Sequence, residues 1–139
     1  MLFDKITIIG IGLIGSSLAR VIMKKGLAGK LCACDKNKEY LAEARELGIV
    51  DEISEDLGKA VENADLVVYA GFMTILDEQI VKAFPNKMMN VHPALIPSFC
   101  GKGFYGLHVH EAVLESGVKL TGATVHFVTE ECDGGPIIL

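Results

Sequence analysis

A glycine triplet near the start of the chain constrains the fold more than any other feature. Gly10, Gly12 and Gly15 follow a short apolar run, Lys5–Gly10, and open a segment with the periodicity of a helix. A buried strand, a glycine turn and a helix in this order are typical of the first unit of a doubly wound sheet. Gly10 permits the tight turn, Gly12 lets the backbone approach a pyrophosphate, and Gly15 lets the helix pack against the strand.

The rest of the chain continues this alternation of strands and helices. Apolar runs predict strands at Lys5–Gly10, Leu31–Asp35, Glu52–Ser54, Leu66–Ala70, Met88–His92, Thr121–Thr129 and, at the end, Pro136–Leu139. Amphipathic segments predict helices at Ile14–Lys25, Lys38–Leu47, Ser54–Asn63, Asp77–Phe84 and Gly106–Ser116. The first helix should have an apolar face and a C-terminal cap at Gly26, and Ser54 should cap the third helix. The residues of that apolar face are Ile14, Leu18, Val21 and Ile22. The pattern predicts an α/β, Rossmann-like doubly wound fold. Its mostly parallel sheet should have helices on both faces, within a single domain over residues 1–139 with halves 1–70 and 71–139.

Composition excludes several classes of protein. The chain has 139 residues, half of them hydrophobic, and a net charge of −5, so it has no basic footprint for nucleic acid. No apolar run is long enough to span a bilayer, which argues against a membrane partner. The four cysteines lack the paired spacing of zinc ligands and fit a reducing, cytoplasmic compartment. A small-molecule ligand is therefore expected, without a metal; the oligomeric state stays open.

Asp35 extends the glycine pattern. It lies at the end of the second predicted strand, about 20 residues beyond the last glycine of the triplet. A carboxylate there accepts from a ribose 2′-hydroxyl and repels a 2′-phosphate, which favours NAD, although Lys36 leaves NADP open. The alternative is a glycine turn that only allows tight packing.

A second group of polar residues lies in the other half. Asn90 and His92 alternate on one strand, so their side chains point the same way at its carboxyl end. An amide can hold a developing oxyanion, a histidine can move a proton, and a nearby carboxylate such as Asp133 favours the charged histidine. Taken alone, Asn90 could instead cap a turn and His92 could be a satisfied histidine at the edge of the core. The other histidines, His108, His110 and His126, are expected to be structural.

The first half resembles prephenate dehydrogenases. The run Ile8–Ala19 (IIGIGLIGSSLA) is typical of them, as is Asp35 followed by a helix and Leu47–Asp51. This similarity covers Met1 to about Ala70. It implies NAD binding through Gly10, Gly12, Gly15 and Asp35. Dehydrogenation is not expected, because that family's second, helical domain has no counterpart here.

The second half resembles glycinamide ribonucleotide formyltransferases. The matching runs are Ala70–Met73, Asn90–Pro97, Gly106–His110, Thr124–Thr129 and Asp133–Pro136. The resemblance implies that Asn90, His92 and Asp133 are catalytic, with formyl-tetrahydrofolate as cosubstrate. It also implies a folate pocket at Met73, Leu76 and Val125–Asp133, and a cis peptide bond at Ile96–Pro97.

Together the two resemblances predict a hybrid chain, engineered or naturally shuffled, whose pattern changes within the strand Leu66–Ala70. One expected function is formyl transfer from formyl-tetrahydrofolate to the amine of glycinamide ribonucleotide, with the glycine loop holding the ribonucleotide phosphate. The alternative is an NAD- or nucleotide-binding scaffold without turnover. A hybrid with no selected ligand is a third interpretation.

Overall fold

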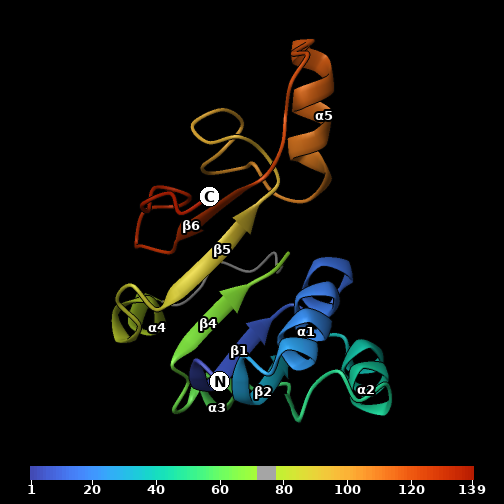
Figure 1. Ribbon diagram of the computed structural model, residues 1–139. Coiled ribbons are helices and arrows are strands. Elements are labelled where there is room, and N and C mark those ends of the chain that lie inside the picture. The colour runs from blue at the N-terminus through green and yellow to red at the C-terminus, as the bar shows by residue number, and fades with distance from the viewer. Residues whose placement is uncertain (72–77) are drawn as a thin grey trace. The chain divides into compact units, whose positions relative to one another are not determined.

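The computed structural model describes residues 1–71 and 78–139. The chain forms two compact units, Met1–Phe72 and Met73–Leu139. Figure 1 shows the first unit in blue to green and the second in yellow to red.

The first unit is a four-stranded parallel sheet with its connecting helices. Its elements are β1 (Phe3–Ile9), α1 (Leu13–Lys25), β2 (Ala28–Cys34), α2 (Lys38–Glu46), β3 (Glu52–Ser54), α3 (Leu57–Val61) and β4 (Leu66–Tyr69). The strand order is β3-β2-β1-β4, with each pair parallel. The chain therefore winds outward from β1 in one direction, then returns to pair β4 on its other side. This reversal is the topological switch point at which doubly wound folds bind ligands.

The core of this unit lies on the strands. Ile8, Leu31 and Val67 are fully buried, and the register joins Ile8 to Val68 across the β1–β4 pair. Such continuous apolar runs are typical of strands covered on both faces. On β1, the hydroxyl of Thr7 donates to the Ala60 carbonyl at 2.7 Å, which ties α3 to the sheet.

Helix α1 packs through small residues. Its buried positions are Gly15, Ala19 and Ile22, whereas Ile14 and Val21 are 41% and 48% exposed. The expected stripe through Ile14, Leu18 and Val21 was therefore wrong, and only Ile22 was correctly placed. The cause is the close approach of α1 to β1, since a Cβ on Gly15 would overlap the Gly10 carbonyl.

Helix α3 begins later than expected. Its N-cap is Asp56, whose Oδ1 accepts from the Lys59 N–H at 2.9 Å. The Ser54 hydroxyl instead donates to the Asp56 carbonyl at 2.8 Å. Ser54 thus shapes the turn before the helix, and the expectation that it caps the helix was wrong.

The second unit contains an antiparallel strand pair. Its elements are α4 (Glu78–Ala83), β5 (Met88–His92), α5 (Leu107–Ser116) and β6 (Thr124–Phe127). The β5–β6 register places Asn90 opposite His126 and His92 opposite Thr124. The strand expected at Pro136–Leu139 is not formed as such. That segment makes an isolated antiparallel bridge, Ile137 to His126.

The expected fold class is confirmed. The chain is an α/β protein of the doubly wound kind with a mostly parallel sheet, and β5–β6 supplies the antiparallel pair. The Ile96–Pro97 peptide bond is cis, as the resemblance implied. Among the described residues, no helix has both the length and the apolar character to cross a membrane.

The packing of α1 gives a stability prediction. Gly15→Ala places a methyl group on the Gly10 carbonyl and should destabilise the fold by about 1–3 kcal/mol, the usual cost of overpacking. Gly12→Ala is the matched control, because a Cβ there meets nothing within 4 Å. The control should change stability by less than about 1 kcal/mol. Urea unfolding measures both, and equal midpoints for the two variants would contradict the packing account.

Candidate active site

The second unit brings the three residues predicted to be catalytic into one buried cluster. Asn90 and His92 lie on β5, and Asp133 lies in the loop after β6. His92 Nδ1 is 3.4 Å from Asp133 Oδ2, and their side chains are only 3% and 10% exposed. A histidine and a carboxylate this close, largely removed from water, interact far more strongly than a surface pair.

A fourth residue, His126, belongs to the same cluster. Its Nε2 lies 3.5 Å from Asp133 Oδ1 and 3.2 Å from Asn90 Nδ2. The two oxygens of Asp133 therefore face different histidines. His126 was expected to be structural, and the structure instead places it within this cluster. Only the β5–β6 register, which sets His126 opposite Asn90, could have revealed it.

The two nitrogens of His92 both face acceptors. Nε2 lies 2.8 Å from the Phe99 carbonyl oxygen, which can only accept, so Nε2 carries a proton. The remaining nitrogen, Nδ1, faces the carboxylate of Asp133.

His126 links Asn90 to Asp133. Its Nδ1–H donates to the Phe127 carbonyl at 2.9 Å, so in the neutral ring Nε2 accepts from the Asn90 amide. In the charged ring, Nε2–H can no longer accept and turns to Asp133. The hydrogen bond with Asp133 raises the pKa of His126, and this outweighs the opposing effect of burial. The charged form is thereby favoured.

Asp133 is held ionised despite its burial. Burial alone would raise its pKa, but hydrogen bonds from His126 and from the Gly101 backbone, with the charges of His92 and His126, bring the pKa below its usual value. The Gly101 N–H donates to Oδ2 at 3.0 Å. Asp133 also has a positive φ of 53°, a conformation that few non-glycine residues adopt outside turns and functional sites.

His108 on α5 lies on the surface and outside this cluster. The side chain of His108 is 60% exposed and lies 3.4 Å from Glu111, one turn further along α5. Met73 and Leu76, expected in the folate pocket, lie outside the described residues.

The glycine loop of the first unit is closed by Asp35. One carboxylate oxygen accepts from the Ile11 N–H at 2.8 Å, and the other accepts from the Asn37 N–H at 2.9 Å. Gly10 has a positive φ of 91°, so the tight turn expected there is present. Asp35 thus joins the loop after β1 to the start of α2, which is the packing interpretation of this motif.

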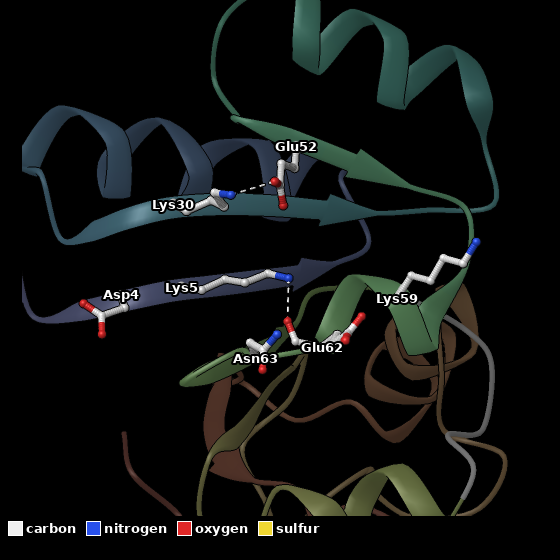
Figure 2. A pocket seen from close by; sticks show the side chains of 7 residues that line it. All are labelled: Asp4, Lys5, Lys30, Glu52, Lys59, Glu62 and Asn63. Atoms are coloured by element: carbon white, nitrogen blue, oxygen red, sulfur yellow. Dashed lines mark hydrogen bonds and ion pairs between the residues drawn. The ribbon is translucent and has the colours of Figure 1, made fainter.

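The first unit also has a charged hollow of about 480 Å³ (Figure 2). It is lined by Asp4, Lys5, Lys30, Glu52, Lys59, Glu62 and Asn63. Lys30 pairs with Glu52 at 2.8 Å, with both side chains about half exposed, and Lys5 donates to the Glu62 carbonyl at 2.7 Å. Among the described residues, none of those expected to bind or react lines this hollow. Exposed pairs of this kind contribute little to stability, and we interpret the hollow as solvated surface.

Comparison with known proteins identifies the family. The model of the family described as formyl transferase matches residues 21–139, and the chain belongs to this family. The chloroplastic phosphoribosylglycinamide formyltransferase of Arabidopsis thaliana is 51% identical over 74 residues, which are 53% of this chain and 25% of that protein. The Escherichia coli phosphoribosylglycinamide formyltransferase is 47% identical over 75 residues, 54% of this chain and 33% of that protein. The matches thus span a third or less of these relatives.

Solved structures agree over nearly the whole chain. Glycinamide ribonucleotide transformylase 1 from Symbiobacterium toebii has a TM-score of 0.77 at 31% identity, covering 98% of this chain and 71% of that one. The phosphoribosylglycinamide formyltransferase from Anaplasma phagocytophilum has a TM-score of 0.75 at 30% identity, with coverage of 98% and 69%.

These findings correct the expectation of a hybrid. The family match begins inside α1 and the structural likeness covers 98% of the chain, so the segment assigned to a prephenate dehydrogenase half lies within the formyltransferase fold. The predicted hybrid was wrong, and NAD binding at Gly10, Gly12, Gly15 and Asp35 is not supported. The physical reason is that glycine turns serve close helix packing in any doubly wound fold, and Asp35 is bonded to backbone amides here.

The polar cluster has a defined pH dependence. Asp133→Asn should lower the pKa of His126, because it removes the interaction that raises this pKa. A histidine whose pKa is raised by folding stabilises the fold at pH values below its pKa in the unfolded chain, and this stabilisation is lost as the pH rises through its pKa in the folded protein. A carboxyl group whose pKa is lowered by folding stabilises the fold at pH values above its pKa in the unfolded chain, and this stabilisation is lost as the pH falls through its pKa in the folded protein.

The stability difference between wild type and Asp133→Asn should therefore be largest between about pH 4 and pH 6.5. NMR titration of the histidine rings and urea unfolding over this range provide the two measurements. An unchanged His126 pKa in the variant would contradict the assigned cause.

Proposed function

We propose that this chain carries the formyl-transfer site of a phosphoribosylglycinamide formyltransferase. The proposed reaction moves the formyl group of formyl-tetrahydrofolate to the amine of glycinamide ribonucleotide. The observation that carries the proposal is the cluster of half-buried Asn90 with His92 and Asp133, in which an ionised carboxylate lies beside a largely buried histidine. The family match and the named activity of the relatives support it.

The chemistry requires charge stabilisation more than a strong base. The amine attacks the formyl carbon, so a carbon–nitrogen bond forms and the formyl oxygen becomes an oxyanion. The Asn90 amide and a His92 N–H are the donors available for that oxyanion. The attacking nitrogen then carries an acidic proton, which the ionised Asp133 can accept even with a lowered pKa.

The second half of the reaction returns the proton. The bond from the formyl carbon to the folate nitrogen breaks, and the carbonyl re-forms. The leaving nitrogen takes up one proton, equal to the one lost by the amine, so Asp133 ends ionised as it began. A carboxylate that cycles in this way needs a fixed position, which its contacts with His92, His126 and Gly101 supply.

The ribonucleotide phosphate is proposed to bind at the glycine loop. Gly12 is the N-cap of α1 and offers no side-chain cap to the first turn of that helix. Unpaired amides and the positive end of the helix dipole favour an anion there. Folate binding is proposed for Val125–Asp133 together with Met73 and Leu76. A reducing cytoplasm is the proposed compartment, which fits four free cysteines.

Hydrolysis of the same formyl donor is a second candidate. A formyltetrahydrofolate deformylase from Pseudomonas syringae has a TM-score of 0.77 at 25% identity, covering 97% of this chain and 49% of that one. Water would then replace the amine as nucleophile. The two reactions are distinguished by measuring formate in the absence of the amine substrate, because hydrolysis releases formate there and transfer does not.

The proposal predicts that His92→Ala and Asp133→Asn each lower formyl transfer about a hundredfold or more. His108→Ala is the matched control, because that exposed histidine lies on α5 with Glu111 as its partner. The assay follows the folate product with glycinamide ribonucleotide present and absent. Transfer that survives both substitutions would assign the chemistry elsewhere. No transfer by the wild-type chain would leave a binding scaffold without turnover.

A further inference from the structure

The loop between β5 and α5 contacts both members of the His92–Asp133 pair through its main chain. The Phe99 carbonyl accepts from His92 Nε2 at 2.8 Å, and the Gly101 N–H donates to Asp133 Oδ2 at 3.0 Å. These groups are separated along the chain only by Cys100. A single short stretch of backbone therefore contacts a histidine ring and a carboxylate that lie on different parts of the chain.

The backbone of this stretch has an unusual shape. Phe99 has a positive φ of 51°, in a region that aromatic residues rarely adopt, and Gly101 has a φ of 90°. The Phe99 ring packs edge-to-face on Phe104, with 6.4 Å between the centroids, and the Phe104 N–H donates to the Gly101 carbonyl at 3.1 Å. These contacts offset the strain at Phe99, which is the usual condition for such strain to persist.

We propose that Phe99–Gly101 is a positioning loop, which holds His92 and Asp133 in place. Through this loop the two nitrogens of His92 have different roles. Nε2 is the anchor, held by the Phe99 carbonyl, and Nδ1 is the nitrogen that faces Asp133 and the reacting formyl group. This inference rests on the proposed function for its catalytic meaning, but its structural content is independent of that function.

The contact lengths support this assignment. At 2.8 Å the Nε2 contact is a short hydrogen bond, whereas 3.4 Å between Nδ1 and Asp133 exceeds the usual range for one. The short bond fixes the ring plane. The long one leaves Nδ1–H able to share its hydrogen with a substrate oxygen. Because the Phe99 carbonyl cannot donate, Nε2 is the nitrogen that donates in this contact, and Nδ1 is the nitrogen left to face Asp133 and the substrate.

The test combines NMR with a pair of matched glycine variants. Gly101→Ala forces a side chain onto a φ of 90° and should move both the Gly101 amide and the adjoining Phe99 carbonyl. Gly103→Ala imposes the same strain at a φ of 94°, but neither His92 nor Asp133 bonds to that residue. A Cβ meets nothing within 4 Å at either position. A difference between the two variants therefore cannot come from steric overlap of the added methyl group.

Long-range proton–nitrogen correlation spectra report which ring nitrogen carries the proton. In the wild type and in Gly103→Ala, neutral His92 should be protonated on Nε2 alone. In Gly101→Ala the two neutral tautomers should mix. A wild-type His92 protonated on Nδ1 when neutral, or an unchanged tautomer in Gly101→Ala, would overturn the proposal.

A second variant covers the case in which Gly101→Ala does not fold. Phe104→Ala removes the ring contact that holds Phe99 and leaves both glycines in place. It should also mix the tautomers of His92. Retention of the wild-type tautomer in Phe104→Ala would count against the loop as a positioning element.

Kinetics then connect the loop to the proposed reaction. Gly101→Ala should lower kcat roughly 10- to 100-fold, because misplacement of a reacting group by about 1 Å has a cost of this size. The KM for the amine should change little, and the pH profile of kcat should shift. Gly103→Ala should retain wild-type kcat. A wild type without formyl transfer would refute the proposed function while the tautomer measurement still decides the role of the loop.

Discussion

The carboxylate of Asp133 is the charge on which the second unit depends. It lies largely out of water, where an unpaired carboxylate would cost several kcal/mol. Its partners come from three parts of the chain, namely His92 on β5, His126 on β6 and the Gly101 amide in the positioning loop. Each contact lowers the cost of the same buried charge. The loss of one partner therefore leaves the buried charge less well compensated, so the stability of the cluster depends on all three.

Local chemistry made much of the fold predictable. The glycine turn at Gly10, the cap at Gly26 and the apolar runs of the strands depend on neighbouring residues, and the structure contains them close to their expected places. The predictions were wrong where contacts with residues distant in the sequence determine which side chains are buried or which segments pair. The buried stripe of α1 follows from contact between Gly15 and the Gly10 carbonyl. The C-terminal segment is joined to Val125 and Phe127 of β6 by backbone hydrogen bonds, but it forms an isolated bridge at His126 and not the expected strand.

In the candidate site, too, features set by neighbouring residues were predictable and those set by distant residues were not. Alternation on a strand gave Asn90 and His92 a common face without any knowledge of the fold. His126 could not be recognised, since its place depends on the register that sets it opposite Asn90. Asp35 illustrates the opposite error. A carboxylate at the end of the second strand fits a ribose in the sequence pattern, yet its oxygens are bonded to the Ile11 and Asn37 amides. A motif that packs well and a motif that binds a nucleotide look alike in sequence.

The buried cluster also couples the donor on Asn90 to a charge elsewhere. In neutral His126, Nε2 accepts from the Asn90 amide, so one of the two N–H groups of that amide is occupied. In charged His126, Nε2 carries a hydrogen and the amide loses its acceptor. Because Asp133 raises the pKa of His126, the ionised carboxylate favours the form in which the amide loses that acceptor. In the proposed reaction, the amide is then available to an oxygen that gains negative charge. One buried carboxylate thus acts on two donors, directly through His92 and indirectly through His126 on Asn90.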